Sequence, residues 1–229
     1  MNMLFITPQT KEKRIGWLLM VPAIVLPLLL PSDNLVLKGC YYLALVLATV
    51  FTFRPFLTES FQALQGNVVS FLWKSALMFV LAELATVLMN DIFLLLQLGG
   101  FAWGQNGPFF LSNYDMYWLR LLPQSHVVGI LLLVLIIPVT QEILLRGLFF
   151  NTIYQRFPSL AIFLTTLAFA LIHTLPYMGG CSADQIFVLF MQYVPTGLLL
   201  CFAYCMTESV FSPIVIHIAI KAYLIYFYL

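Results

Sequence analysis

The sequence predicts an all-α membrane protein, a polytopic transmembrane bundle of about seven spans. Three observations support this fold class: 62% of the 229 residues are hydrophobic, only 8% are charged, and the mean hydropathy is +1.01. A soluble domain carries roughly 25% charged residues, so this chain lacks the polar groups to cover a surface that faces water. Lipid must therefore solvate most of the molecule.

Seven apolar runs mark the expected spans: residues 15–30, 35–53, 68–98, 127–154, 159–177, 185–206 and 209–229. The third and fourth runs exceed the hydrocarbon thickness, so these helices should tilt or extend into water. Residues 99–125 are expected to form the one long loop. Since no repeat or linker is visible, we expect one integral membrane domain. Residues 1–125 would supply the N-terminal spans and the outer loop, and residues 126–229 the core spans that carry the motifs below.

The charge pattern bears on partners and location. A net charge of +1 gives no basic footprint for nucleic acid, so the expected partners are membrane lipid and a membrane peptide or protein. An excess of Lys and Arg on one side predicts a cytoplasmic N-terminus. The first span should be retained, because Pro22 and Pro27 interrupt it and no signal-peptide cleavage pattern follows. Compact length and the missing organelle signal favour a bacterial plasma membrane.

Ionisable residues inside apolar runs are the candidates for function, because a charge in lipid is unfavourable and usually faces the bundle interior. They are Glu83, Asp91, Glu142, Arg146, His173, His217 and Lys221. Glu142 and Arg146 are four residues apart and share a helix face. Alone, this pair is explained equally well as a structural ion pair that locks the bundle.

Helix geometry places several of these groups at one depth. At ~1.5 Å per residue, Glu142 lies ~21 Å from the inner end of its helix, His173 ~22 Å, Lys221 ~21 Å and His217 ~15 Å. A carboxylate can take a proton from water, and imidazole can orient that water or stabilise an oxyanion. One histidine in a span is usually structural, but two meeting the Glu–Arg pair favour a site. Gln141 adds an amide about 100° around the helix from Glu142.

A metal centre is the competing interpretation of these residues. One Glu and two His form a known zinc set. Here, however, the groups lie on three helices without a His-Glu-x-x-His motif, and Arg146 would oppose a cation. We therefore expect no metal and no cofactor.

Three motifs in order resemble the CPBP family, which comprises CAAX proteases and bacteriocin-processing enzymes and is also called the Abi family. They cover about residues 127–221 and read Gln141-Glu142-x-x-x-Arg146, Phe169-x-x-x-His173 and His217-x-x-x-Lys221. The resemblance implies a metal-independent, glutamate-type intramembrane endopeptidase. In it, a glutamate and the first histidine activate water, and the second histidine and an asparagine stabilise the oxyanion. Gln141, Arg146, Phe169 and Lys221 would support the catalytic residues.

Two positions depart from the family pattern. The glutamate that the family uses for catalysis corresponds to Gln141, and an amide cannot accept the proton of water. The asparagine position holds Lys221, a cation that could stabilise an oxyanion or pair with Glu142.

Two functions therefore stay open. The first, which we favour on the family resemblance, is hydrolysis of a membrane-associated peptide by a variant centre of Glu142, His173 and His217. The second is a catalytically silent relative that acts by binding, in bacteriocin self-immunity or in the regulation of a membrane partner. A transporter fits less well, because repeats and paired broken helices are missing.

Overall fold

The computed structural model describes residues 6–29, 34–96, 125–178 and 181–228. Within these ranges every regular element is a helix, so the predicted all-α class is confirmed. The expected long loop, residues 99–125, lies outside the described residues except for Ser125.

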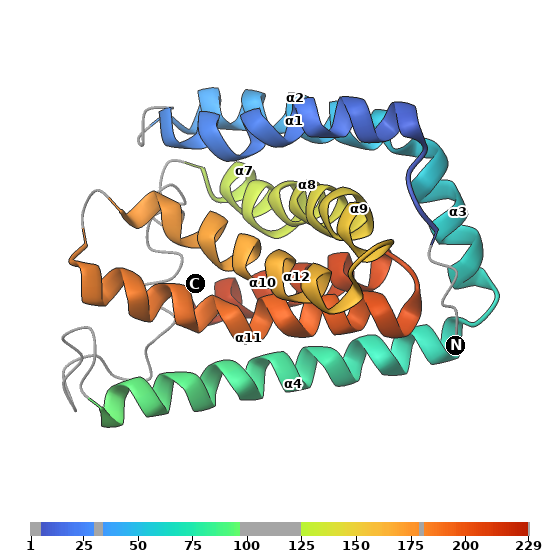
Figure 1. The fold of residues 1–229 in the computed structure, drawn as a ribbon. Helices are drawn as coiled ribbons and strands as arrows, with labels where there is room; N and C mark the ends of the chain where they lie inside the picture. Colours follow the sequence, from blue (N-terminus) through green and yellow to red (C-terminus); the bar gives the residue numbers. More distant parts are fainter. Residues whose placement is uncertain (1–5, 30–33, 97–124, 179–180, 229) are drawn as a thin grey trace.

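The helices are arranged as a central group flanked on two sides (Figure 1). The N-terminal helices α1 (Thr10–Leu29) and α2 (Leu35–Thr52) pack side by side along one side. The short helix α3 (Arg54–Gln65) crosses one end, and α4 (Val68–Leu95) runs along the opposite side. The functional candidates all belong to the central group, apart from Glu83 and Asp91 on α4.

The central group begins with one continuous helical span, residues 126–154, which we call the motif span. Its segments are α7 (His126–Ile130), η3 (Leu131–Ile136), α8 (Ile137–Glu142), η4 (Ile143–Phe150) and α9 (Asn151–Tyr154). Then follow α10 (Pro158–Thr174) with the 3-10 turn η5 (Leu175–Tyr177), α11 (Ala183–Thr207) and α12 (Phe211–Tyr228).

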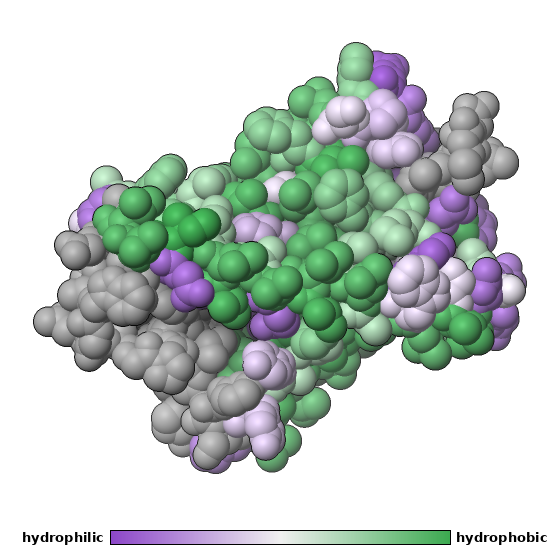
Figure 2. All heavy atoms as spheres, turned by 90° about the horizontal axis from the view of Figure 1, so that it is seen from below, coloured by the Kyte–Doolittle hydropathy of each residue, from purple (hydrophilic) through white to green (hydrophobic). Residues whose placement is uncertain are grey.

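Five of the described helices are long and apolar enough to cross a membrane: 35–52, 68–93, 126–154, 158–177 and 183–207. The multi-pass prediction is thus confirmed, but the count of seven is not. The helix α1 begins with charged residues from Lys11 to Arg14, and α12 offers only a shorter apolar stretch. The face that α4 helps to form is broadly apolar, and hydrophilic residues gather mostly toward its ends (Figure 2). Such a surface suits contact with lipid.

Helix α3 has no counterpart among the predicted spans. It buries Phe56 and Ser60 and exposes polar residues such as Glu59, an amphipathic pattern rather than an apolar run. Buried Glu12 of α1 connects the start of α1 to the first turn of α3. The Glu12 carboxylate accepts hydrogen bonds from the backbone N–H of Phe56 (3.2 Å) and from the backbone N–H of Gln9. One side chain thus satisfies N-terminal donors of two helices.

The motif span carries two π-helical stretches, η3 and η4, on either side of α8. Such stretches are rare and often mark functional sites. The second stretch fills the core, with Ile143, Leu148 and Phe150 fully buried. Gly147 lets α3 approach, because a Cβ there would lie only 2.9 Å from Cε1 of Phe56.

Polar side chains fasten α4 to the central group. Three hydrogen-bonded pairs, which we call the α4 ladder, join it to α11 and α12: Ser75–Ser212 (2.7 Å), Thr86–Thr196 (3.3 Å) and Asn90–Gln192 (2.7 Å). Interhelical bonds of this kind help to hold helices together in lipid. The ladder therefore fixes α4 beside α11 and α12, and with it Glu83.

Candidate functional site

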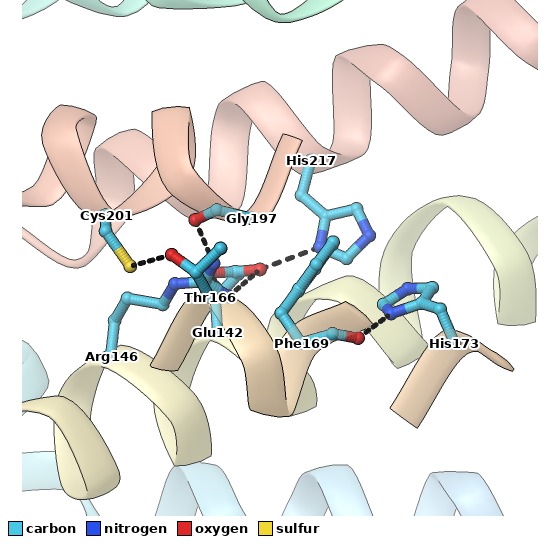
Figure 3. Close-up of polar contacts among 8 residues, drawn as sticks. All are labelled: Glu142, Arg146, Thr166, Phe169, His173, Gly197, Cys201 and His217. Atoms are coloured by element: carbon cyan, nitrogen blue, oxygen red, sulfur yellow. Dashed lines mark hydrogen bonds and ion pairs between the residues drawn. The ribbon is translucent and has the colours of Figure 1, made fainter. Parts of the chain in front are cut away.

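The centre of the site is a buried cluster around Glu142 (Figure 3). The carboxylate, at the end of α8, has no exposed surface. Nη1 of Arg146 lies 3.0 Å from Oε1 and 2.9 Å from Oε2. Nδ1 of His217, from α12, donates to Oε1 at 2.8 Å. The Glu142 carboxylate is thus paired with the Arg146 guanidinium and hydrogen-bonded to the His217 imidazole. A buried carboxylate needs partners of this kind.

Arg146 connects this cluster to α10 and α11. Its Nη2 donates to the carbonyl of Gly197 at 3.0 Å, and its guanidinium lies 4.8 Å from the ring centroid of Phe169. Glycine at 197 lets α11 pack closely on α10, because a Cβ there would lie 3.0 Å from Cδ1 of Phe169 and 3.2 Å from the carbonyl oxygen of Thr166. The guanidinium of Arg146, on the motif span, thus contacts both α11, at Gly197, and α10, at Phe169.

His173 lies beside the cluster on α10. Its Nδ1 is 2.9 Å from the carbonyl of Phe169. Since a carbonyl can only accept, Nδ1 carries the proton and Nε2 is an acceptor in the neutral ring. The imidazole packs against the rings of Phe169 (4.2 Å), Tyr193 (4.7 Å) and His217 (5.6 Å between centroids). The fixed ring therefore has a defined direction in which it can accept a proton.

A cavity of about 60 Å³ adjoins this cluster. Since one water needs roughly 10–15 Å³ by this measure, the cavity admits several waters or a small group. Its polar lining includes Thr140, Gln141, His173, Tyr193 and Lys221. Apolar walls come from α1 and α2, with Met20, Ala23, Ile24, Tyr42 and Leu45. The space therefore lies between the N-terminal helix pair and the motif span.

The neighbours Gln141 and Glu142 face different surroundings. Gln141 is among the residues that line the cavity, whereas Glu142 and His217 are not among those described there. Adjacent residues on a helix point about 100° apart, so only one of them can face a given space. The cavity consequently meets an amide at 141, and the carboxylate at 142 turns toward Arg146 and His217.

Lys221 reaches the cavity from α12. It is only 7% exposed, and its charge acts both on Glu83 of α4 and on His173. Glu83 is half-buried, so α4 contributes a carboxylate near the site, while Asp91 is exposed. Lys221 thus lines the cavity from α12, and α12 packs against α4, the helix that carries Glu83.

The structure brings together the groups that the sequence placed at one depth. Glu142 contacts His217 and Arg146, the two imidazole rings are neighbours, and Lys221 shares the cavity with His173. Sequence reasoning missed the contributions of α1, α2 and α11, including Tyr193 and Gly197. No motif marks these positions, because an apolar wall or a glycine in a span has many uses.

Residues 123–223 match the family model described as Type II CAAX prenyl endopeptidase Rce1-like. This segment is therefore similar to the Rce1-like CAAX proteases of the CPBP family. It includes the site residues of the motif span, α10, α11 and α12, and it confirms the predicted resemblance. No curated protein and no solved structure matches this chain.

The similarity to the CPBP family gives the two departures from its pattern a location. Gln141, at the position of the family's first glutamate, lines the cavity. Glu142, at the second, forms the ion pair with Arg146. Lys221, at the asparagine position, lines the same cavity. Both exchanges therefore alter the groups that a bound molecule would meet, and the buried Glu–Arg pair is kept.

Proposed function

We propose that this chain is a protease-like CPBP protein that binds a membrane-embedded peptide in its cavity without hydrolysing it. It would then act by binding, as an immunity or regulatory protein of a bacterial plasma membrane. One observation carries the proposal: the cavity is lined by the amide of Gln141, and Glu142 is held by Arg146 and His217. An amide cannot take the proton of an attacking water.

The bonding of Glu142 argues against its use as a general base. Both carboxylate oxygens already lie within 3.0 Å of Arg146 Nη1, and one also accepts from His217. To reach water in the cavity, Glu142 would have to leave these partners. Removing one partner from a buried ion pair costs about 3–5 kcal/mol. Catalysis through Glu142 would therefore begin with a large unfavourable step.

Peptide hydrolysis by a variant centre is the second candidate function. In it, Glu142 is the base, His173 orients the water, and His217 and Lys221 stabilise the oxyanion. The chain of contacts from Glu142 through His217 to His173, with rings 5.6 Å apart, supports this candidate. A proton could pass from His217 to Glu142 across their 2.8 Å hydrogen bond.

A cleavage assay separates the two functions. The full chain in detergent is incubated with a library of apolar membrane peptides, and fragments are identified by mass spectrometry. We expect no cleavage by the wild type and new cleavage by Gln141→Glu, which restores a carboxylate at the cavity. Gln141→Asn is the matched control that keeps an amide. Cleavage by the wild type that Glu142→Ala abolishes would overturn the proposal in favour of the variant-centre protease.

Binding itself needs a separate measurement. Peptides that carry a photo-crosslinking group are added to the same preparation, and crosslinked protein is quantified. Ile24 lines the cavity, so the larger side chain of Ile24→Trp should occupy the cavity and abolish crosslinking. Val21→Trp is the control, because Val21 on the same helix is 62% exposed and does not line the cavity. Equal crosslinking of both variants would show that the peptide binds elsewhere.

A further inference from the structure

A second pocket lies where α4 begins and α11 ends, and it shares no described lining residue with the cavity beside Gln141. The short helix α3 leads into α4 at the same end (Figure 1). The pocket has a volume of about 190 Å³. Since one water needs roughly 10–15 Å³ by this measure, it admits a group of several heavy atoms. We call it the Lys74 pocket, and its polar lining is Asn67, Ser70, Lys74, Thr207 and Glu208.

The Lys74 pocket lies at the level of lipid head groups. The apolar spans of α4 and α11 end there, at Val68 and Thr207, and the ends of spanning helices lie near the boundary between hydrocarbon and water. Lys74 is ~9 Å along α4 from Val68, and a lysine side chain in a helix extends back toward the N-terminus and reaches the head groups. Its neighbour Trp73 is 54% exposed, as is typical of the aromatic residues at this boundary.

Lys74 supplies a positive charge and hydrogen-bond donors. Its Nζ donates to the carbonyl of Met206 at 2.8 Å, in the last turn of α11, where carbonyls lack partners within the helix. An ammonium carries three N–H donors, so a ligand oxygen can accept from the same side chain. Ser70 lies one turn earlier on the same face of α4 and adds a hydroxyl to the lining. These groups match the oxygens of a phosphate.

Glu208 occupies a backbone position that glutamate rarely adopts. Among the described residues it is the one non-glycine residue with a positive φ, 53°. It ends α11 in the left-handed conformation, a position at which glycine is usual. A negative charge is also unfavourable at the C-terminus of a helix. Since neither the backbone nor the helix dipole favours glutamate here, its presence points to a use for the carboxylate.

Lys74 and Glu208 line one pocket without forming an ion pair. The salt bridges within the described residues both involve Glu142. A ligand that is only an anion would meet the carboxylate of Glu208, and one that is only a cation would meet the ammonium of Lys74. A ligand group that carries both charges matches the pocket.

We propose that the Lys74 pocket binds the head group of a phospholipid that carries a primary ammonium beside its phosphate, as in phosphatidylethanolamine. The phosphate oxygens accept from Lys74 and Ser70, and the ammonium donates to the carboxylate of Glu208. A choline head group has the same charges, but its nitrogen carries no N–H to donate. This site is independent of the proposed peptide binding, which uses the cavity beside Gln141.

An apolar strip beside the pocket suits the acyl chains. Leu77 and Leu81 follow Lys74 on the same face of α4 and are 37% and 36% exposed. On α11, Phe202 lies one turn before Met206 and is 40% exposed. The two helices pack against each other. A lipid with its head group in the pocket can therefore lay its chains along exposed apolar side chains, which a soluble ligand would not use.

The test compares three lipids with the same dioleoyl chains. The full chain in detergent is mixed with phosphatidylethanolamine, phosphatidylcholine or phosphatidylglycerol, and bound lipid is quantified by native mass spectrometry to give Kd values. An ion pair near water changes an affinity by up to about fivefold. We expect phosphatidylethanolamine to bind roughly fivefold more tightly than either of the other lipids.

Variants assign the two charges. Glu208→Gly removes the carboxylate and suits the left-handed backbone, so Tm should not fall, and the preference for phosphatidylethanolamine over phosphatidylglycerol should be lost. Lys74→Gln keeps a donor for the carbonyl of Met206 but removes the charge, and it should weaken binding of both lipids by about fivefold. Glu59→Gln is the control, because Glu59 is an exposed carboxylate of α3 outside the pocket lining. It should leave all three affinities unchanged.

Four results would overturn the inference. Equal affinities for the three lipids would show only non-selective lipid contact, and tighter binding of phosphatidylglycerol would show a site for anionic lipid. Displacement of the lipid by an equimolar amount of soluble phosphoethanolamine would assign the pocket to a small molecule in water. Unchanged affinities in Lys74→Gln would show that Lys74 only caps α11. None of these results bears on peptide binding in the cavity, so the two proposals fail separately.

Discussion

Replacing Arg146 with methionine tests whether the Glu–Arg pair holds the central helices together. The substitution keeps a flexible apolar stem but removes the contacts of Nη1 with both oxygens of Glu142 and the bond of Nη2 to the carbonyl of Gly197. The carboxylate, with no exposed surface, would keep only His217 as partner. Leaving one charge of a buried pair uncompensated costs about 3–5 kcal/mol.

Thermal unfolding in detergent, followed by circular dichroism, measures this loss. For a chain of this size, each kcal/mol of lost stability lowers Tm by about 2–4 °C. The expected loss therefore lowers Tm by roughly 6–20 °C. Exposed Arg156 gives the control: Arg156→Met should change stability by less than about 0.5 kcal/mol. The double variant Arg146→Met with Glu142→Leu should recover part of the loss, because it removes both charges of the pair and leaves neither of them uncompensated. A Tm for Arg146→Met within 2 °C of the wild type, or a double variant no more stable than the single one, would refute this reasoning.

Two further substitutions test the packing around the site. Gly197→Ala should destabilise the protein by about 1–3 kcal/mol, because its Cβ would lie 3.0 Å from Cδ1 of Phe169. Gly39→Ala, with Val128 at an ordinary 3.6 Å, should not destabilise, and equal Tm values for the two variants would contradict this. Ser75→Ala removes the 2.7 Å bond to Ser212 and should cost about 0.6–1.7 kcal/mol. A double-mutant cycle of Ser75→Ala and Ser212→Ala measures the coupling energy between the two serines. A coupling energy of zero would refute the hydrogen bond.

The sequence predicted the meeting of the motif residues because helix rise is nearly constant. Counting residues from the ends of three helices put Glu142 and His173 at the same depth, and His217 one turn away. The structure has all three in one contact network. Long apolar runs also located most helices, since a helix that crosses lipid needs about 20 apolar residues.

Other features had no readable signal. Helix α3 is half polar, so its sequence does not contain an apolar run that would mark it as a helix. Which of Gln141 and Glu142 faces the cavity depends on the rotation of the motif span, which its neighbours and its π-helical stretches set together. The cavity wall from α1 and α2 depends on tertiary packing between segments that are far apart in the sequence. Lys221 illustrates the same limit, because the carboxylate that acts on it, Glu83, lies on α4, outside the segment that carries the motifs.

The α4 ladder has a consequence for how the chain assembles in the bilayer. Synthesis proceeds from the N-terminus, so α4 enters lipid before its partners on α11 and α12 exist. Until then, Ser75 and Asn90 face hydrocarbon or provisional neighbours, and each unpaired polar group there is unfavourable. Arrival of the last two helices removes this penalty and selects one rotation of α4. The final step of insertion thereby sets how α4 packs against α11 and α12, and a chain truncated before α11 would leave α4 without a fixed orientation.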